Sequence, residues 1–560
     1  LIVTVFSFFL TIYNRVFNYF AKFQCYDFGS VKSIRCFFMN TLFIHPFFPQ
    51  KSLFKAYDIR GDVTLFTDDF VWSLARAFAK LFVYAHQTAA TTTTLAVNKA
   101  TVVIGYDARH QSQEIAKYMA YACQQAGLVV QWLGLTTTPM MAFMAQQFSG
   151  NGLMVTASHS QKHINGIKWL INHESPSGDD VQQLYEALIG YKAIVPDDRL
   201  IAAIRQTTYS TPKDFFATYI QAIEQAFAYI NQSKRTQTTY FHAPQQIVID
   251  CMHGATSDFA EALFSQLGYC CIMLNASPDG NFPQGNPDPT QSNRLTHLAH
   301  TVKATGSDIG LAFDGDGDRV MVIDAQGQMI SPDNLLYLLS RIAIEELPST
   351  HTSTDKKVIF DVKCSHHVPN LIASHGATPM MTKTGSSLMR KSLQNKSDNA
   401  IFAGELSGHF IFNDGYFVLH DDAMYAAARL LNWLSHQPIS LNDILASLPT
   451  CISTADMYLP IADNHYGQTV IARITALGKK PFKRLKSSFA VKNVNTIDGL
   501  RLDFAEGFGI LRKSNTGSFL TVRFSANDVA ELRHIQSIFV DLCRTIDDNL
   551  AEQVAQIQPV

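Results

Sequence analysis

Gly152-Leu-Met-Val-Thr-Ala-Ser158-His159 is the stretch of the chain from which its fold is best understood. It begins as an apolar run typical of a buried strand and ends in a polar turn that carries a serine and a histidine. Most serines after a strand only cap backbone groups. Three polar motifs farther along favour a reactive serine here. They are Phe313-Asp314-Gly-Asp316-Gly-Asp318-Arg319, Gly404-Glu405-Leu-Ser407-Gly408-His409 and Arg512-Lys-Ser514-Asn515-Thr516.

Around this run, strand-like and helix-like segments alternate, a pattern typical of α/β domains. Strands are predicted at residues 101–106, 128–133, 246–250, 270–274, 358–361 and 378–382. Helices are predicted at 113–126, 258–267 and 366–375, and a surface loop at 89–94. From about residue 451 the pattern changes to shorter strands and turns. We therefore predict an α/β fold of three related mixed-sheet domains, followed by a smaller C-terminal α+β domain.

Polar stretches between the repeats indicate where the domain boundaries lie. The predicted units are an N-terminal extension at 1–50, a first domain with the serine loop at 51–208, a second with the aspartate loop at 209–328, a third with the Glu405 loop at 329–448 and a fourth with the Arg512 loop at 449–560.

The N-terminal extension is rich in phenylalanine. Leu1 to Asn14 carries no charge, yet it is shorter than the roughly 20 apolar residues of a spanning helix. It also lacks the basic start and cleavage site of a signal peptide. The first methionine is Met39. We favour an upstream region included in the translation, without structure of its own, and the alternative is a membrane tether.

Composition excludes several classes of protein. Hydrophobic residues at 47% and charged residues at 16% are typical of a folded protein. A formal net charge of -2 predicts no nucleic-acid partner, because such binding needs a basic face. Nine cysteines without Cys-x-x-Cys spacing favour reduced thiols and a cytoplasmic location.

The aspartate motif predicts a metal site. Asp314, Asp316 and Asp318 alternate with glycines, so their carboxylates can converge on one hard cation such as Mg²⁺. An EF-hand is excluded, because Arg319 and Ala325 stand where that loop needs glycine and glutamate. The alternative is a solvated acidic turn, in which three close carboxylates would repel one another.

The other motifs suit a phosphorylated sugar. Phosphoryl transfer needs a nucleophilic oxygen, a cation and a proton carrier, and Ser158, His159 and Lys168 offer such groups. A purely structural His159 remains an open alternative. The Arg512 motif offers a guanidinium, hydroxyls and an amide to a phosphate. Glu405 and Ser407 suit sugar hydroxyls, although this pair alone has little specificity.

Taken in order, these motifs resemble the α-D-phosphohexomutase superfamily, most closely the bacterial phosphomannomutase/phosphoglucomutase group, from Phe54 to about Arg544. The motifs that carry the resemblance are Tyr57-Asp-Ile-Arg60-Gly, Thr156-Ala-Ser158-His159, Asp314-Gly-Asp-Gly-Asp318-Arg319, Asp361-Val-Lys363-Cys, Lys383-Thr-Gly385, Gly404-Glu405-Leu-Ser407-Gly-His409 and Arg512-x-Ser514-Asn515-Thr516. The resemblance implies four domains around a central cleft.

It also implies an enzyme that interconverts mannose 6-phosphate and mannose 1-phosphate, and the corresponding glucose phosphates, as a cytoplasmic monomer. A phosphoserine and a hexose 1,6-bisphosphate intermediate, which is also the activator, would carry the phosphoryl group. Mg²⁺ would be held by phosphorylated Ser158, Asp314, Asp316 and Asp318. The implied catalytic residues are Ser158, His159, Lys168, Arg60, Arg319 and His409. The implied substrate-binding residues are Tyr57, Lys363, Ser386, Glu405, Ser407, Arg512, Ser514, Asn515 and Thr516.

Three departures from the family pattern stand out. Ser160-Gln161 replaces a common Asn-Pro, Ser386 stands where a histidine is frequent, and Gly517-Ser518 replaces Thr-Pro. The nucleophile, the three aspartates and the arginine are kept, so activity is expected. A phosphoglucosamine mutase and a catalytically silent sugar-phosphate binding protein are the alternatives.

Overall fold

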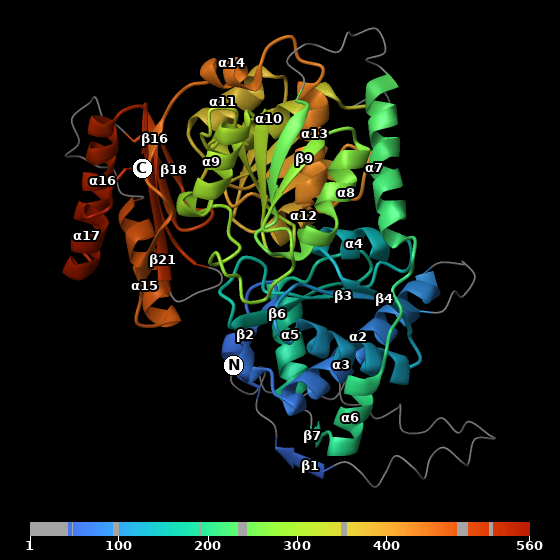
Figure 1. The fold of residues 1–560 in the computed structure, drawn as a ribbon. Helices are drawn as coiled ribbons and strands as arrows, with labels where there is room; N and C mark the ends of the chain where they lie inside the picture. The colour runs from blue at the N-terminus through green and yellow to red at the C-terminus, as the bar shows by residue number, and fades with distance from the viewer. Residues whose placement is uncertain are drawn as a thin grey trace.

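The computed structural model describes residues 43–46, 49–92, 100–189, 192–232, 244–348, 355–478, 491–514 and 519–559. The strands within these ranges form four large sheets and one two-stranded ribbon. In Figure 1 the first sheet and its helices lie in blue and teal below the green, yellow and orange units. The C-terminal unit, in orange and red, stands to one side.

The first sheet has the order β2-β6-β5-β3-β4. Its strands are β2 (Ile59–Asp62), β3 (Thr101–Tyr106), β4 (Val129–Leu135), β5 (Gly152–Val155) and β6 (Ile164–Leu170). β3 pairs in parallel with β4 and β5, and β6 is antiparallel to β5 and β2. The accompanying helices are α2 (Asp68–Thr92), α3 (Ser112–Gln125), α4 (Thr138–Gln146), α5 (Gly178–Ile189) and α6 (Asp198–Gln206). The loop predicted at 89–94 is wrong as far as Thr92, because α2 continues to that residue.

The second and third sheets repeat this arrangement with four strands each. The second has the order β9-β8-β10-β11, and its strands are β8 (Gln246–Asp250), β9 (Cys270–Leu274), β10 (Ile309–Phe313) and β11 (Val320–Asp324). The third has the order β13-β12-β14-β15, and its strands are β12 (Lys357–Asp361), β13 (Thr378–Thr382), β14 (Ala400–Gly404) and β15 (Phe410–Phe412). The accompanying helices are α7 (Phe215–Gln232), α8 (Ala260–Gln266), α9 (Thr296–Thr305), α10 (Pro332–Glu345), α11 (His367–Ser374), α12 (Ser386–Gln394), α13 (Ala423–Leu434) and α14 (Leu441–Ala446).

Each of these three sheets contains three neighbouring parallel strands and an antiparallel strand beside them, and the first sheet has β2 as an additional edge strand. The link between the last parallel strand and the antiparallel one is the functional loop in all three. These loops are β5–β6 with Ser158, β10–β11 with the aspartates, and β14–β15 with Glu405. A shared topology therefore places three different motifs at one equivalent position. The predicted three related α/β mixed-sheet units are confirmed.

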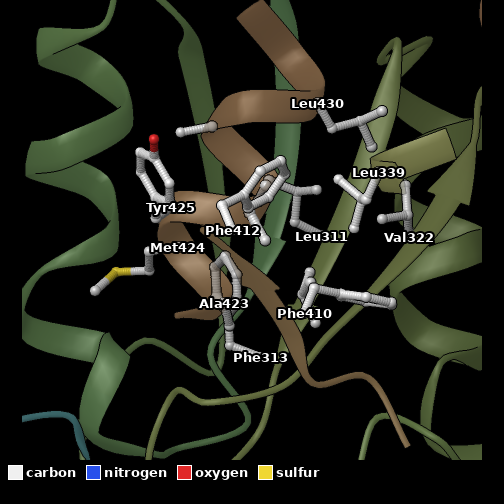
Figure 2. Close-up of a cluster of buried hydrophobic side chains, with 14 of the residues drawn as sticks. Leu311, Phe313, Val322, Leu339, Phe410, Phe412, Ala423, Met424, Tyr425 and Leu430 are labelled. Atoms are coloured by element: carbon white, nitrogen blue, oxygen red, sulfur yellow. The ribbon is translucent and has the colours of Figure 1, made fainter. Parts of the chain in front are cut away.

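The second and third units share one hydrophobic core. Every residue of α13 is buried, and Figure 2 shows its side chains, Tyr425 and Leu430 among them, beside Phe313 of β10 and Phe412 of β15. Burial of such aromatic and aliphatic groups contributes about 1.5–3 kcal/mol each. The two sheets are therefore held together by apolar packing, and the boundary at 328 stays a prediction.

The C-terminal unit is built on an antiparallel sheet, as the change of pattern after residue 451 predicts. Its order is β16-β21-β20-β19-β18, with β17 paired to β21. The elements are β16 (Ile452–Ser453), β17 (Met457–Pro460), α15 (Asn464–Gly478), β18 (Asn493–Asn495), β19 (Leu500–Asp503), β20 (Gly507–Lys513), β21 (Phe519–Ala526), α16 (Val529–Arg544) and α17 (Asp548–Ala555). Arg512 lies within β20, next to its last residue, and Ser514 follows directly after the strand.

The N-terminal extension is partly structured. β1 (Phe43–Pro46) pairs antiparallel with β7 (Lys192–Val195) in the two-stranded ribbon. The expectation of no structure throughout 1–50 is therefore wrong at these four residues, because backbone groups of β7 offer them a hydrogen-bonding edge. Residues 1–42 lie outside the described part of the chain.

Among the helices of the described ranges, none combines the length and the apolar character needed to cross a lipid bilayer.

Candidate active site

Ser158 sits in the turn after β5 with a φ of 51°, a left-handed conformation that a serine adopts only when neighbours hold it there. Its Oγ donates a hydrogen bond of 2.6 Å to Asp314 Oδ2 and lies 3.3 Å from His159 Nδ1. The first and second units thus meet at this hydroxyl. Burial, together with Arg319 and Arg60, holds the pKa of His159 well below its usual value. His159 is therefore a neutral imidazole beside the serine oxygen.

A buried arginine holds the serine loop in shape. Arg109 donates hydrogen bonds to the backbone carbonyls of Ser158 at 2.5 Å, Ser160 at 2.6 Å, Gln161 at 2.8 Å and Ile164 at 3.0 Å. Its Nε lies 3.1 Å from Asp107 Oδ2. Five donors in a fixed fork allow one side chain to orient an entire turn. Sequence reasoning missed Arg109, although it lies in the turn that follows the strand predicted at 101–106.

Replacing Arg109 by lysine is expected to lower kcat by about 10²-fold and to leave KM within about threefold, because one ammonium cannot reach four carbonyls in this fork. The carbonyls that are left unpaired also cost stability, on the order of 1–3 kcal/mol each. Steady-state kinetics and thermal unfolding measure both effects. Arg199→Lys, at an exposed position on α6, is the matched control and should change neither. An Arg109→Lys enzyme with unchanged kcat would contradict the role.

The aspartate loop packs directly against this turn. A Cβ on Gly315 would lie 2.5 Å from the Ser158 carbonyl oxygen, so only glycine permits the approach. Asp314 Oδ1 accepts from the backbone N–H of Gly317 at 3.0 Å, and Asp316 Oδ2 accepts from Thr138 Oγ1 at 2.5 Å. Oxygen atoms of Asp314, Asp316 and Asp318 lie within 4.8 Å of one another, and all three residues are buried.

This carboxylate group fits a divalent cation. Burial, followed by the charges of Asp318 and Asp316, raises the pKa of Asp314 well above its usual value. Among the described residues, Asp316 Oδ1 is buried without a hydrogen-bond partner, so this oxygen can accept another ligand. Oxygen-only donor sets suit hard cations such as Mg²⁺ or Mn²⁺. The side chains present here therefore fit a divalent metal ion.

Three cationic side chains surround the carboxylates. Lys168 Nζ lies 2.7 Å from Asp316 Oδ2 and 2.5 Å from Asp318 Oδ2. Burial alone would lower the pKa of Lys168, but these two carboxylates raise it, so the lysine stays charged. Arg319 Nε lies 3.9 Å from Asp314 Oδ2, and His409 Nε2 lies 3.2 Å from Asp318 Oδ1.

Glu405, in the β14–β15 loop, is held in its ionised form. Its Oε1 accepts from the Gly385 backbone at 2.6 Å, and its Oε2 accepts from Ser407 Oγ at 2.6 Å. Burial would raise the pKa of Glu405, but hydrogen bonding and charge from His409 outweigh it and lower the pKa to about 2. Conversely, Asp318 and Glu405 outweigh burial at His409 and raise its pKa to about 9.

The third and fourth units contribute the cationic side chains of Lys363 and Arg512. Lys363 Nζ lies 2.5 Å from Asp456 Oδ2, which joins the two units. Arg512 Nε donates to Asp498 Oδ2 at 2.8 Å, whereas Arg512 Nη2 is buried and has no hydrogen-bond partner in the part of the chain that the structure describes. A buried guanidinium nitrogen without a partner is suited to an anionic ligand.

These side chains surround one cleft of about 600 Å³. The predicted site residues that line it are Tyr57, Arg60, Ser158, His159, Lys168, Asp318, Arg319, Lys363, Ser386, Glu405, Ser407, His409, Arg512 and Ser514. Asp314 and Asp316 lie buried behind Ser158 and Lys168. Asn515 and Thr516 fall outside the described residues. The sequence-predicted residues that the structure describes are thus brought together.

The cleft also contains groups that the sequence did not suggest. Arg390 on α12 pairs with Asp421 and donates to Ser175 Oγ at 3.1 Å, which connects the third unit to the first. His420 lines the cleft beside Asp421. The sequence His420-Asp421-Asp422 lies directly before α13, where polar residues are often only helix caps, and it was not singled out.

Comparison with known proteins identifies the chain. It is 34% identical over 499 residues to the phosphomannomutase/phosphoglucomutase of Pseudomonas syringae pv. tomato, which covers 89% of this chain and 96% of that protein. The chain belongs to the phosphoglucomutase/phosphomannomutase family. Family models for the alpha/beta/alpha domains I, II and III of phosphoglucomutase/phosphomannomutase match residues 51–192, 217–327 and 331–451.

Other members of the phosphoglucomutase/phosphomannomutase family agree over similar lengths. The phosphoglucomutase of Neisseria gonorrhoeae is 34% identical over 87% of this chain and 96% of its own. A crystal structure of a phosphoglucomutase/phosphomannomutase family protein from Burkholderia thailandensis superposes with a TM-score of 0.72 at 29% identity, over 91% of this chain and 99% of that one. The superfamily resemblance of the sequence motifs is therefore confirmed, and the buried aspartates agree with a divalent-metal site in such a protein.

Proposed function

We propose that this chain is a phosphohexomutase that interconverts the 6-phosphates and 1-phosphates of mannose and glucose. The observation that carries the proposal is the 2.6 Å contact between Ser158 Oγ and Asp314, at one end of a cleft whose other side holds Arg512. The Ser158 hydroxyl and the Arg512 guanidinium thus line the same cleft, which supports phosphoryl transfer on one side of it and phosphate binding on the other. The names of its relatives support the same activity.

Phosphorylated Ser158 gives its phosphoryl group to the free hydroxyl of the hexose phosphate, and a hexose 1,6-bisphosphate forms. The sugar then turns around, and its other phosphate returns to Ser158. Arg512, Ser514, Asn515 and Thr516 hold the phosphate that does not react, with Lys363 beside it. Glu405 and Ser407 bind sugar hydroxyls that the two orientations present alike. Tyr57 and Ser386 complete the walls of the pocket.

Phosphorylation adds about -1.5 to -2 charges next to three carboxylates, so the donor needs cations around it. Asp314, Asp316 and Asp318 would hold Mg²⁺ together with the phosphoserine, and the ion would supply charge stabilisation for the transferring group. Arg319 and Arg60 face the same region as fixed positive charges, which stabilise the transition state without reorganisation. Lys168, whose Nζ lies 2.7 Å from Asp316 Oδ2 and 2.5 Å from Asp318 Oδ2, neutralises part of the charge of the aspartates.

Turnover of mannose 6-phosphate, glucose 1-phosphate and glucosamine 6-phosphate, each with a trace of sugar bisphosphate as activator, tests the proposal. Mannose and glucose phosphates are expected to react, and glucosamine phosphate to react much more slowly. Preference for glucosamine phosphate would make the chain a phosphoglucosamine mutase. Tight binding of all three without turnover would indicate a silent sugar-phosphate binding protein.

Arg512→Ala is expected to lower kcat/KM for mannose and glucose phosphates by similar factors, each about 10²-fold. The reason is that Arg512 contacts the phosphate, which both substrates share, and a charge-assisted hydrogen bond contributes about 1.5–3 kcal/mol. Parallel steady-state assays of the two substrates measure the ratio, which should stay within about threefold.

Arg544→Ala, at an exposed position on α16, is the control and should leave both substrates unaffected. If Arg512→Ala impaired only one of the two sugars, Arg512 would not contact a group common to both. Rejection of glucose phosphate by wild-type enzyme by more than about a thousandfold, roughly 4 kcal/mol, would end the claim of dual specificity.

A further inference from the structure

The two oxygens of each carboxylate in the aspartate group are not equivalent, because one of them is already held by the protein. Asp314 Oδ1 accepts hydrogen bonds from three backbone N–H groups of its own loop at 3.0, 3.1 and 3.2 Å. Asp318 Oδ2 lies 2.5 Å from Lys168 Nζ. Asp316 Oδ2 accepts from Thr138 Oγ1 at 2.5 Å and from Lys168 Nζ at 2.7 Å. The second oxygen of each carboxylate is therefore the one that can face an ion.

Asp316 is held by Thr138 at two points. The backbone N–H of Thr138 donates to the Asp316 carbonyl oxygen at 2.9 Å, and its hydroxyl donates to Asp316 Oδ2 at 2.5 Å. Both residues are buried, and within the described ranges Asp316 Oδ1 has no hydrogen-bond partner. The terminal torsion of an aspartate is broad, so contacts to one oxygen decide which oxygen faces a ligand. The hydroxyl of Thr138 thus keeps Oδ1 as the available oxygen.

Thr138 is itself fixed by the start of α4. It is the first residue of this helix, and Thr137 caps the helix by accepting from the Met140 N–H at 3.2 Å. Pro139 follows, a residue whose fixed φ suits the first turn of a helix. A Cβ on Gly317 would lie 2.9 Å from Thr137 Cγ2, so the aspartate loop packs directly on this helix start. The first unit therefore holds the aspartate loop here as well as at Ser158.

An engaged Asp316 Oδ2 bears on the choice of ion. Mg²⁺ takes about six ligands at about 2.0–2.1 Å in near-ideal octahedral geometry. Ca²⁺ takes about six to eight oxygens at about 2.3–2.6 Å and readily accepts both oxygens of one carboxylate. A carboxylate that can offer only Oδ1 suits the smaller ion, because it adds a single ligand and cannot close around a larger one.

We infer that Thr138 is a positioning residue that presents Asp316 Oδ1 alone to the divalent cation, and that it thereby favours Mg²⁺ over Ca²⁺. This inference rests on the proposed mutase function, in which the aspartates hold the ion. Lys168 contacts the same Oδ2 and supplies charge there, whereas the short side chain of Thr138 on a rigid helix start sets the orientation. Removal of a partner of this kind, behind a metal ligand, changes metal affinity by about 10- to 100-fold.

Thr138→Val tests the inference, because valine has nearly the same shape and keeps the backbone N–H but lacks the hydroxyl. The full-length protein is freed of metal with EDTA and brought to the same phosphate content in each variant. Titration with Mn²⁺, followed by the paramagnetic resonance of free Mn²⁺, gives affinities in the absence of sugar, and displacement gives those of Mg²⁺ and Ca²⁺. Thr138→Val is expected to weaken Mg²⁺ and Mn²⁺ by about tenfold or more and Ca²⁺ by less than about threefold. Thr138→Ser, which keeps a hydroxyl, should restore the preference for Mg²⁺.

Thr136→Val is the matched control. Thr136 is equally buried two residues earlier, and its Oγ1 has no hydrogen-bond partner in the part of the chain that the structure describes. This variant should bind all three ions as the wild type does. Thermal unfolding without metal shows which variants are folded, and Thr138→Ala serves if the valine variant is not.

An unchanged ratio of Mg²⁺ to Ca²⁺ affinity in folded Thr138→Val would overturn the role of Thr138. So would a serine variant that behaves like the valine variant, because the hydroxyl would then not be the group that matters. The binding assay contains no sugar, so its result does not depend on turnover. A wild type that binds Mg²⁺ in preference to Ca²⁺ but turns over no hexose phosphate would contradict the proposed function instead, which keeps the two failures distinguishable.

Discussion

Ser158→Ala is expected to lower turnover by about four orders of magnitude or more, the largest effect of any single substitution in this chain. Loss of a covalent nucleophile has effects of this size in other enzymes, because no other group can take its place in the cycle. Ser158 Oγ lies 2.6 Å from Asp314 Oδ2 and lines the cleft, so a phosphate on this oxygen would sit next to the cation. Substrate binding should persist, since Arg512 and Glu405 are untouched.

Phosphopeptide mapping and single-turnover assays measure this result together. The wild type should carry phosphate on the peptide that contains Ser158, and the variant should carry none. Ser149→Ala is a suitable control, because Ser149 precedes the start of β5, at the end away from Ser158. Its hydroxyl donates to the Thr101 carbonyl at 2.7 Å and accepts from Asn151 Nδ2 at 3.3 Å. Phosphate found on another residue, with Ser158→Ala fully active, would refute the mechanism.

Removal of the divalent cation is expected to have the second largest effect, a loss of about 10³-fold, roughly 4 kcal/mol of transition-state stabilisation. Without the ion, Asp314, Asp316 and Asp318 repel one another in a buried space, as the raised pKa of Asp314 indicates. Chelation with EDTA followed by readdition of Mg²⁺ measures the loss and its recovery. Added Mg²⁺ should also raise the unfolding temperature of the apo enzyme, because the ion binds the folded state.

Asp316→Asn should weaken both Mg²⁺ binding and turnover, since it removes the charge of a carboxylate whose buried Oδ1 has no hydrogen-bond partner among the described residues. Asp324→Asn is the control, because Asp324 Oδ1 accepts only turn N–H groups of Gln326 and Gln328 at the far end of β11. Turnover that survives exhaustive chelation, with the ion content verified by elemental analysis, would remove the cation from the mechanism.

Much of the fold was predictable because its signals are local. Apolar runs bounded by turns place β3, β8, β9 and β13 at the residues predicted for them. Helix ends differ by one or two residues, as expected where terminal hydrogen bonds are optional. The ribbon of β1 and β7 was not predictable, because it pairs segments about 150 residues apart and depends on the edge that β7 presents.

The residues of the site also fall into a group that local sequence predicts and a group that it does not. Ser158 and the three aspartates were predictable from motif chemistry, because each motif is contiguous in the sequence. Arg109 was not, since it acts on carbonyls about 50 residues away. Thr138 and Arg390 were missed for the same reason: their partners, Asp316 and Ser175, lie in other parts of the chain. The surroundings of Ser386, which stands where the family often has a histidine, could not be predicted either, because its neighbour Arg390 is held by Asp421 from another part of the chain.

The repeated strand order of the first three sheets has a consequence for the ancestry of this protein. The same link between the last parallel strand and its antiparallel neighbour bears the serine in one copy, the aspartates in the next and Glu405 in the third. Such a pattern is expected from two rounds of duplication of one ancestral unit, followed by divergence of a single loop. Each of the three repeats now carries a different part of the site. Loss of any one repeat would therefore remove a group that the other two do not supply.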